Sequence, residues 1–125
     1  MALLPEAVSK AWEDRKGPAI FVTVNESGVP NAIYVSCVSK FGEDTIVVAN
    51  NYFSKTKENI LAGSKGSILF MANKGGAYQI KGTIEYFTEG EIFDDMKKWN
   101  PSSHPGHGAA AIRVEEVYSG AKKLL

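Results

Sequence analysis

Two lysines at the start of a short predicted helix have the clearest chemistry in this chain. The helix is expected to begin after Ser54 and to end at Gly63. A helix N-terminus carries a partial positive charge that favours acidic residues, yet Lys55 and Lys57 occupy its first turn. An anion would relieve this conflict, because backbone N–H groups, two ammonium groups and the hydroxyls of Ser54 and Thr56 could bind a phosphate together. The alternative interpretation is a surface helix with two solvated lysines.

The residues before this helix could hold a flat heteroaromatic ring. Two amide side chains and two aromatic rings are adjacent there, in the run Asn50, Asn51, Tyr52 and Phe53. Amides can hydrogen-bond the edge of a ring and aromatic side chains can stack on its face, so this run suits a heterocycle attached to a phosphate. The alternative is a strand end with turn-forming asparagines.

A strand expected over residues 29–39 mixes apolar and polar side chains on both faces, which suits the wall of a ligand site but is also typical of an edge strand. Its Cys37 is the only cysteine, so no intramolecular disulfide can form and a reducing, cytoplasmic setting is expected. A nucleophilic role for Cys37 is not expected, because no sequence feature supplies an activating base.

No metal site is expected. His104 and His107 stand three positions apart in a loop rich in proline and glycine, without the further ligands that a closed zinc shell needs. They are interpreted as solvated loop residues. The sequence also lacks a P-loop and a dinucleotide-binding fingerprint, which disfavours ATP hydrolysis and a Rossmann cofactor site.

Composition limits the choice of partners. Fourteen basic and fourteen acidic residues in a chain of 125 leave no overall attraction to nucleic acid or to acidic membranes. Neither a signal peptide nor a membrane-spanning segment is expected, because no apolar run is long enough. Binding must therefore depend on local sites.

Hydrophobic periodicity and turn residues predict six strands with helical insertions. The strands are expected over residues 18–25, 29–39, 45–49, 66–72, 77–87 and 109–118. Helices are expected over residues 3–16, after Ser54, and from a capping box between Thr88 and Glu91 to Trp99. The short connections favour an antiparallel barrel or sandwich over a parallel sheet.

In these features the chain resembles the pyridoxamine 5′-phosphate oxidase-like split-barrel flavoproteins, and it is most similar to their small FMN-binding branch. The likeness spans residues 17–118, including the turn before Pro30 and the run of residues 78–82. Its most specific part is the pair Lys55 and Thr56, with Asn59 one helical turn later.

The resemblance implies a fold and an assembly. A single domain over residues 1–125 is expected to form a six-stranded antiparallel Greek-key split barrel, dominated by β-structure, with a helix within residues 1–17 packed on it. Such proteins form homodimers that bind one FMN in each of two clefts between the subunits.

The resemblance also assigns parts of FMN to residues of this chain. The phosphate is expected on Lys55 and Thr56. Groups of the second strand are expected to assist, namely Val35, Ser36 and Cys37. The isoalloxazine ring is expected along the run Ala49, Asn50, Asn51 and Tyr52. Its pyrimidine edge is expected near Gln79 or Lys81, with residues around Trp99 reaching it from the other chain.

A flavoprotein of this kind is expected to be an oxidoreductase or an electron carrier, with a small molecule or a redox protein as its electron partner. The alternative is a non-catalytic protein that binds or stores FMN or another phosphorylated heterocycle. Oxidation of vitamin B6 is not expected, because the chain is shorter than the oxidases and lacks their basic C-terminal motif for pyridoxal phosphate. An oligonucleotide-binding barrel is disfavoured by the zero net charge.

Overall fold

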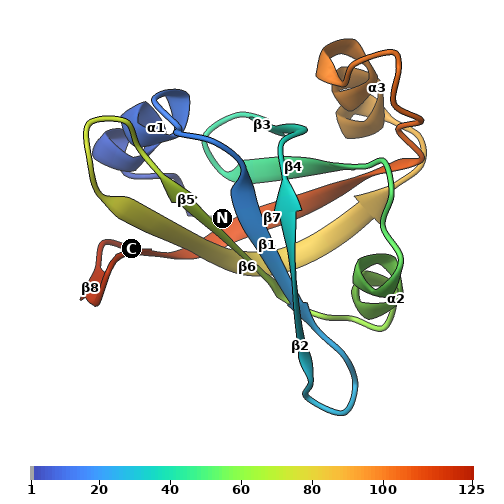
Figure 1. Cartoon of the computed structure of the whole chain (residues 1–125), viewed down its shortest axis with the longest axis horizontal. Coiled ribbons are helices and arrows are strands. Elements are labelled where there is room, and N and C mark those ends of the chain that lie inside the picture. Colours follow the sequence, from blue (N-terminus) through green and yellow to red (C-terminus); the bar gives the residue numbers. More distant parts are fainter. Residues whose placement is uncertain (1) are drawn as a thin grey trace.

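A strongly bent antiparallel sheet forms the body of the protein in the computed structural model, which describes residues 2–125 (Figure 1). Its strands are β1 (Ala19–Val24), β2 (Pro30–Val35), β3 (Val38–Lys40), β4 (Thr45–Asn50), β5 (Gly66–Met71), β6 (Ala77–Phe87), β7 (Gly108–Ser119) and β8 (Lys122–Lys123). The order is β2-β1-β5-β6-β7-β4-β3, with β8 paired to β7. The predicted antiparallel split barrel is thus confirmed.

Three helices lie at the ends of the long strands. They are α1 (Glu6–Glu13), α2 (Lys55–Leu61) and α3 (Glu91–Trp99). Figure 1 shows α1 near one end of β6 and β7, and α2 and α3 near the other end. In the same view, no helix lies in front of β1, β2 and β5.

The strand expected over residues 29–39 is two strands, which accounts for part of the difference between the six strands predicted and the eight observed. Strand β2 pairs with β1, whereas β3 pairs with β4 at the other end of the sheet. Ser36 and Cys37 make the crossing, and the backbone turns tightly there because Val38 N donates to Ser36 O at 3.1 Å. These two residues therefore connect the two edge strands of the sheet, β2 and β3.

Strands β6 and β7 are the longest pair and bend around the core at Gly82. The register shifts between Lys81 and Gly82. A Cβ atom at Gly82 would lie 1.7 Å from Arg113 O, far inside van der Waals contact. Glycine is required at this bulge because the backbone of β7 occupies the space of any side chain.

The core has two parts on opposite sides of β4 and β7. The larger part fills the barrel, and Trp12 of α1 packs edge to face on Phe70 with ring centroids 5.1 Å apart. The smaller part lies under α3, where Met96 packs with Val47 and Ala111. All six residues of β4 are buried, because both of its faces are covered.

The helix ends differ partly from expectation. Helix α2 ends as predicted, with Gly63 at a φ of +96°, Gly63 N bonded to Ile60 O and Ser64 N bonded to Asn59 O. The predicted Ser54 side-chain cap is absent, because Ser54 makes no capping hydrogen bond. The predicted capping box before α3 was also wrong. Gly90, at a φ of +95°, precedes the helix, and no side chain caps it.

Candidate functional site

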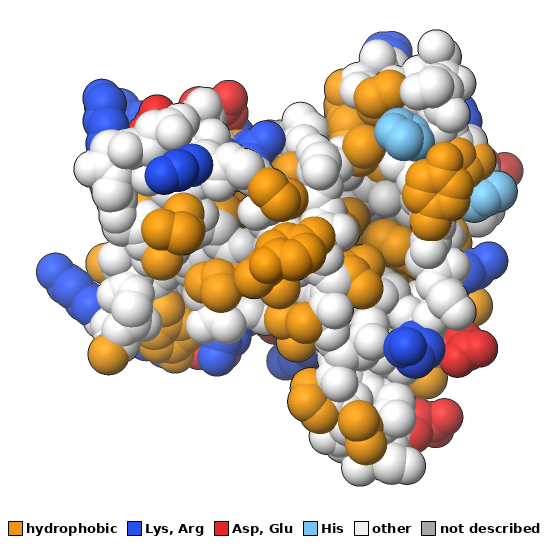
Figure 2. Space-filling model, in the orientation of Figure 1, with side chains coloured by type: hydrophobic (Ala, Val, Ile, Leu, Met, Phe, Trp, Pro, Cys, Tyr) orange, Lys and Arg blue, Asp and Glu red, His pale blue; other side chains and the backbone are white. Residues whose placement is uncertain are grey.

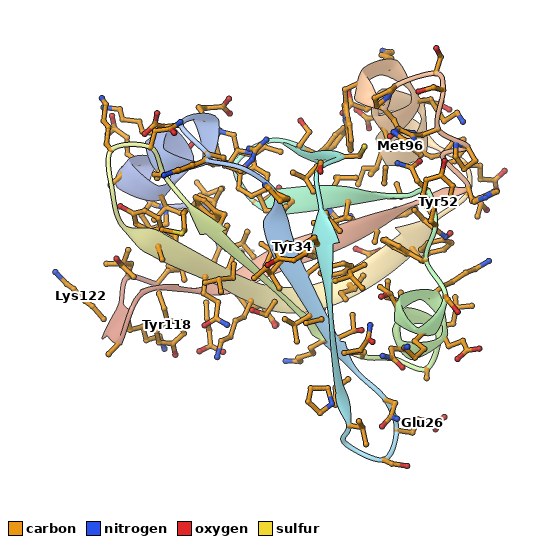
Figure 3. The ribbon with its side chains drawn as sticks, in the orientation of Figure 1. Glu26, Tyr34, Tyr52, Met96, Tyr118 and Lys122 are labelled. Atoms are coloured by element: carbon orange, nitrogen blue, oxygen red, sulfur yellow. The ribbon has the colours of Figure 1, made fainter. Side chains whose placement is uncertain are left out.

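A groove of about 410 Å³ lies where the crossing from β2 to β3 meets the end of β4. Six residues that sequence reasoning assigned to a ligand line it together: Val35, Ser36, Cys37, Ala49, Asn51 and Tyr52. Figure 3 shows Tyr34 and Tyr52, two of its lining residues, coming from separate parts of the chain. The groove therefore combines the predicted second-strand group with the predicted ring-binding run.

The groove has backbone, hydroxyl, thiol and aromatic groups in its walls. Cys37 O accepts a hydrogen bond from Ala49 N at 3.0 Å, which holds the two walls together. Cys37 itself is half-buried and is the only cysteine. The mixture of apolar surface with a few polar groups is typical of small-molecule sites.

Asn50 shapes the groove without lining it. Its side chain is buried, with Nδ2 donating to Tyr86 Oη at 2.7 Å and Oδ1 accepting from Phe53 N at 2.9 Å. Both ends of the amide thus bond to the protein. The side chain thereby ties the segment between β4 and α2 to Tyr86 of β6.

The first turn of α2 continues from the groove. Phe53 lines the groove and the exposed Lys55 follows two positions later. Thr56 is only 2% exposed and its hydroxyl accepts a hydrogen bond from Asn31 Nδ2 at 3.1 Å. Lys57 Nζ lies 5.8 Å from the centre of the Tyr86 ring.

Gln79 and Lys81 are not in the groove of the same chain. They line a second hollow, of about 290 Å³, on the outer face of β1, β5 and β6. Gln79 Nε2 donates to Ser67 Oγ at 2.8 Å. Lys81 Nζ lies 5.0 Å from the centre of the Tyr118 ring.

Glu116, which lines this second hollow, is hydrogen-bonded to a phenolic group. Tyr118 Oη donates to Glu116 at 2.7 Å. This hydrogen bond raises the pKa of Tyr118 and lowers the pKa of Glu116, because it favours the neutral phenol and the ionised carboxylate.

Trp99 also lies away from the groove. It ends α3 and packs on the smaller part of the core. Its Nε1 is buried and has no hydrogen-bond partner within residues 2–125.

Sequence reasoning missed four residues that line the groove. Three of them are Ile33, Tyr34 and His104, which were given no ligand role. The fourth, Phe53, belongs to the predicted ring-binding run but was not assigned a part of FMN, and the structure places it in the groove wall. His104 was interpreted as a solvated loop residue, and no local pattern contradicts that interpretation. Only the path of the loop between α3 and β7 brings it to the groove.

Across residues 2–125, no cluster of three or more His, Cys, Asp or Glu side chains is arranged to hold a metal ion. Within the same part of the chain, none of the helices has the length and apolar character needed to cross a membrane.

Known proteins share this fold and sequence pattern. The uncharacterized protein MJ0282 of Methanocaldococcus jannaschii is 29% identical, over 93% of this chain and 80% of its own length. The crystal structure of HupZ from Group A Streptococcus superposes with a TM-score of 0.80 at 23% identity, covering 94% of each chain. An FMN-binding protein from Syntrophomonas wolfei superposes with a TM-score of 0.72 at 21% identity, covering 90% of this chain and 94% of its own.

The sequence model of the pyridoxamine 5′-phosphate oxidase family matches residues 4–119, which include every strand from β1 to β7 and the whole groove. The chain therefore belongs to the pyridoxamine 5′-phosphate oxidase family.

Proposed function

We propose that this protein binds FMN in the groove and uses it as an oxidoreductase or an electron carrier. The observation that carries the proposal is the groove itself, where six residues expected to contact FMN share one hollow of about 410 Å³. Membership in the family and the FMN-binding relative of the same fold support the choice of ligand. The volume falls in the range of small-molecule sites, roughly 300–1,000 Å³.

The lining suits the isoalloxazine ring of FMN. Tyr34, Tyr52 and Phe53 offer aromatic surface, while Val35 and Ala49 offer small apolar surface. A flat, amphipathic ring is stabilised by such faces and by a few hydrogen bonds at its edge. FMN supplies the hydride and electron chemistry, whereas the protein binds, orients and tunes it.

The phosphate of FMN is placed beside Lys55 in this proposal. Lys55 is exposed and stands two positions after the groove residue Phe53, which supports giving its ammonium group to an ester that extends from the groove. Thr56 assists through its hydroxyl, which accepts from Asn31 and keeps its own proton for donation.

A second copy of the chain is expected on the outer face of β1, β2 and β5, which we name the apolar sheet face. Its members with substantial exposure are Val24, Tyr34, Leu69 and Met71. Figure 2 shows hydrophobic side chains gathered across the middle of this view. Contiguous apolar surface of this kind marks protein interfaces, and Tyr34 is 76% exposed within it.

The dimer would complete the FMN site. The groove borders the apolar sheet face through Tyr34, and the second hollow borders it through Val22 and Val24. A twofold dimer buries the same surface on both subunits. It can therefore present Gln79 or Lys81 of one chain to the flavin of the other, where a cation would stabilise the anionic reduced ring.

The colour of the purified protein is the first test. An FMN-loaded protein has absorbance bands near roughly 370 and 450 nm. A colourless protein that also fails to take up added FMN would contradict the proposal.

Reactivity then separates the two classes of function. In stopped-flow mixing, an oxidoreductase or electron carrier is oxidised rapidly by particular quinone or protein acceptors after photoreduction. If the protein only stores FMN, its reduced flavin is oxidised by every acceptor no faster than free reduced FMN.

A further inference from the structure

His104 and Tyr52 form a pair on the wall of the groove. His104 Nδ1 and Tyr52 Oη are 3.3 Å apart. The two rings meet nearly edge to face, at 83°, with centroids separated by 5.8 Å. Both residues line the groove although 52 positions separate them in the sequence.

Buried groups determine where His104 lies. The loop between α3 and β7 is attached to the end of β4 by Gly106 N, which donates to Asn51 Oδ1 at 3.0 Å. His107 N donates to Asn50 O at 2.8 Å. These bonds hold the loop against the groove, so His104 is positioned by the fold.

We infer that His104 contacts the ligand in the groove, where its Nε2–H donates a hydrogen bond to a carbonyl oxygen of a flat heterocycle. The identity of that heterocycle as FMN rests on the proposed function. The isoalloxazine ring offers such acceptors, because its pyrimidine edge carries two carbonyl oxygens.

The direction of the hydrogen bond between Tyr52 Oη and His104 Nδ1 follows the tautomer of His104. In a neutral imidazole one nitrogen carries the proton and the other accepts. When Tyr52 Oη donates to Nδ1, the ring proton lies on Nε2. In that tautomer the Nε2–H can donate a hydrogen bond. No side-chain or backbone group within residues 2–125 is hydrogen-bonded to Nε2.

Packing does not explain this pair. Tyr52 is 75% exposed and belongs to neither part of the core. The neighbouring His107 is a contrast within the same loop, because it is exposed and does not line the groove. The groove thus has one of the two histidines in its wall.

The test compares four variants in FMN and riboflavin binding, measured by quenching of flavin fluorescence. His104→Phe keeps a flat ring but has no hydrogen-bond donor. It is expected to raise the dissociation constants of both flavins roughly 5- to 10-fold, which corresponds to one lost hydrogen bond. His104→Gln retains a donor and is expected to bind more tightly than His104→Phe. Tyr52→Phe is expected to raise the dissociation constants of both flavins about 2- to 5-fold. His107→Phe is the matched control and is expected to bind like the wild type.

Equal losses for FMN and riboflavin support contact with the ring. The inference is overturned if the wild type binds FMN and His104→Phe binds equally well, or if His104→Gln is no tighter than His104→Phe. If the wild type binds neither flavin, the proposed function fails and the inference fails with it. Thermal melting of each variant confirms that the chain compared is folded.

Discussion

Asn51 and Asn100 exchange two side-chain hydrogen bonds, of 2.9 and 3.1 Å, within the protein interior. Both residues are buried, and 49 positions separate them. Asn51 Oδ1 also accepts a hydrogen bond from Gly106 N, which is the third hydrogen bond of the Asn51 side chain. The end of β4 is thereby joined to the loop that carries His104, so groove shape and loop position depend on the same amides.

We predict that Asn100→Ala destabilises the protein, because it leaves the buried Asn51 Nδ2 without its acceptor and removes one of the two donors to Asn51 Oδ1. The expected loss is about 1–3 kcal/mol in the free energy of unfolding, or roughly 4–12 °C in melting temperature. Thermal melting followed by circular dichroism measures it. Ser102→Ala, in the exposed part of the same loop, is the control, and an equal effect of both changes would show that the amide pair has no special role.

Lys55→Ala is expected to weaken FMN binding more than riboflavin binding, because the proposed site puts the lost ammonium group on the phosphate that only FMN carries. A charge-assisted hydrogen bond predicts a loss of roughly tenfold or more for FMN. Thr56→Ala is expected to act in the same direction. Isothermal titration with both flavins provides the measurement, with Lys74→Ala in the exposed β5–β6 turn as control. Equal losses for both flavins would place Lys55 away from the phosphate.

Leu69→Glu is expected to separate the proposed dimer. Leu69 lies on the apolar sheet face, directly opposite Ile20 and Gln79 in the sheet register. A carboxylate buried there without a partner is expected to raise the dimer dissociation constant roughly 100-fold or more.

Analytical ultracentrifugation distinguishes a dimer from a monomer of 13.5 kDa. Leu61→Glu, on the exposed side of α2 and outside this face, is expected to remain dimeric. Wild-type protein that sediments as a monomer while holding FMN would refute the assembly but leave the groove intact.

Gly82→Ala is expected to prevent folding or to yield a strongly destabilised protein. Its Cβ would lie 1.7 Å from Arg113 O, and a strand backbone cannot move aside without breaking the β6–β7 ladder. Expression in soluble form and the far-UV circular dichroism spectrum report the outcome. Gly120→Ala provides a comparison, because no atom lies within 4 Å of its Cβ although its φ is +59°. A stable Gly82→Ala protein would show that the bulge tolerates a side chain.

Acid is expected to remove part of the stability through Glu43. Its hydrogen bond from Lys40, and next its interaction with Ser9, lower the pKa of Glu43 below the ordinary 4.5. A carboxyl with a lowered folded-state pKa stabilises the protein above the unfolded-state pKa, and this stability is lost as the pH falls through the folded-state pKa.

Glu43→Gln is therefore expected to melt at a lower temperature than the wild type at pH 7, and the difference should shrink below about pH 4.5. Melting curves between pH 7 and pH 3 measure this. Glu26→Gln, in the exposed β1–β2 turn (Figure 3), is the control. A difference that stays constant with pH would exclude the carboxylate as its cause.

The sequence predicted much of the fold because its signals are local. Alternating residues identified β6, whose even-numbered side chains Tyr78, Ile80 and Ile84 indeed pack against the core. Gly63 ended α2 because a left-handed backbone at that position needs only the preceding turn of helix. The Lys55–Thr56 pair indicated the family, and the family match confirms that conclusion.

The errors came from interactions that cross the sheet. Nothing in residues 29–39 shows that Ser36 and Cys37 carry the chain from one end of the sheet to the other, since β3 is determined by pairing with β4. The expected cap at Ser54 and the capping box near Thr88 follow local preference, but Gly90 and the surrounding packing set where those helices begin.

The sequence alone determined most strand and helix types and the family, because periodicity and turn chemistry act over a few neighbouring positions. It also supplied the residues that we propose to bind a phosphorylated ring. Only the tertiary structure decided that Val35, Cys37 and Tyr52 share one groove while Gln79 and Lys81 line another hollow. The tertiary structure also showed that His104, expected in solvent, lines the groove. The physical reason is that these placements depend on strand pairing and buried amide contacts between residues about 50 positions apart, such as Asn51 and Asn100, which no local pattern encodes.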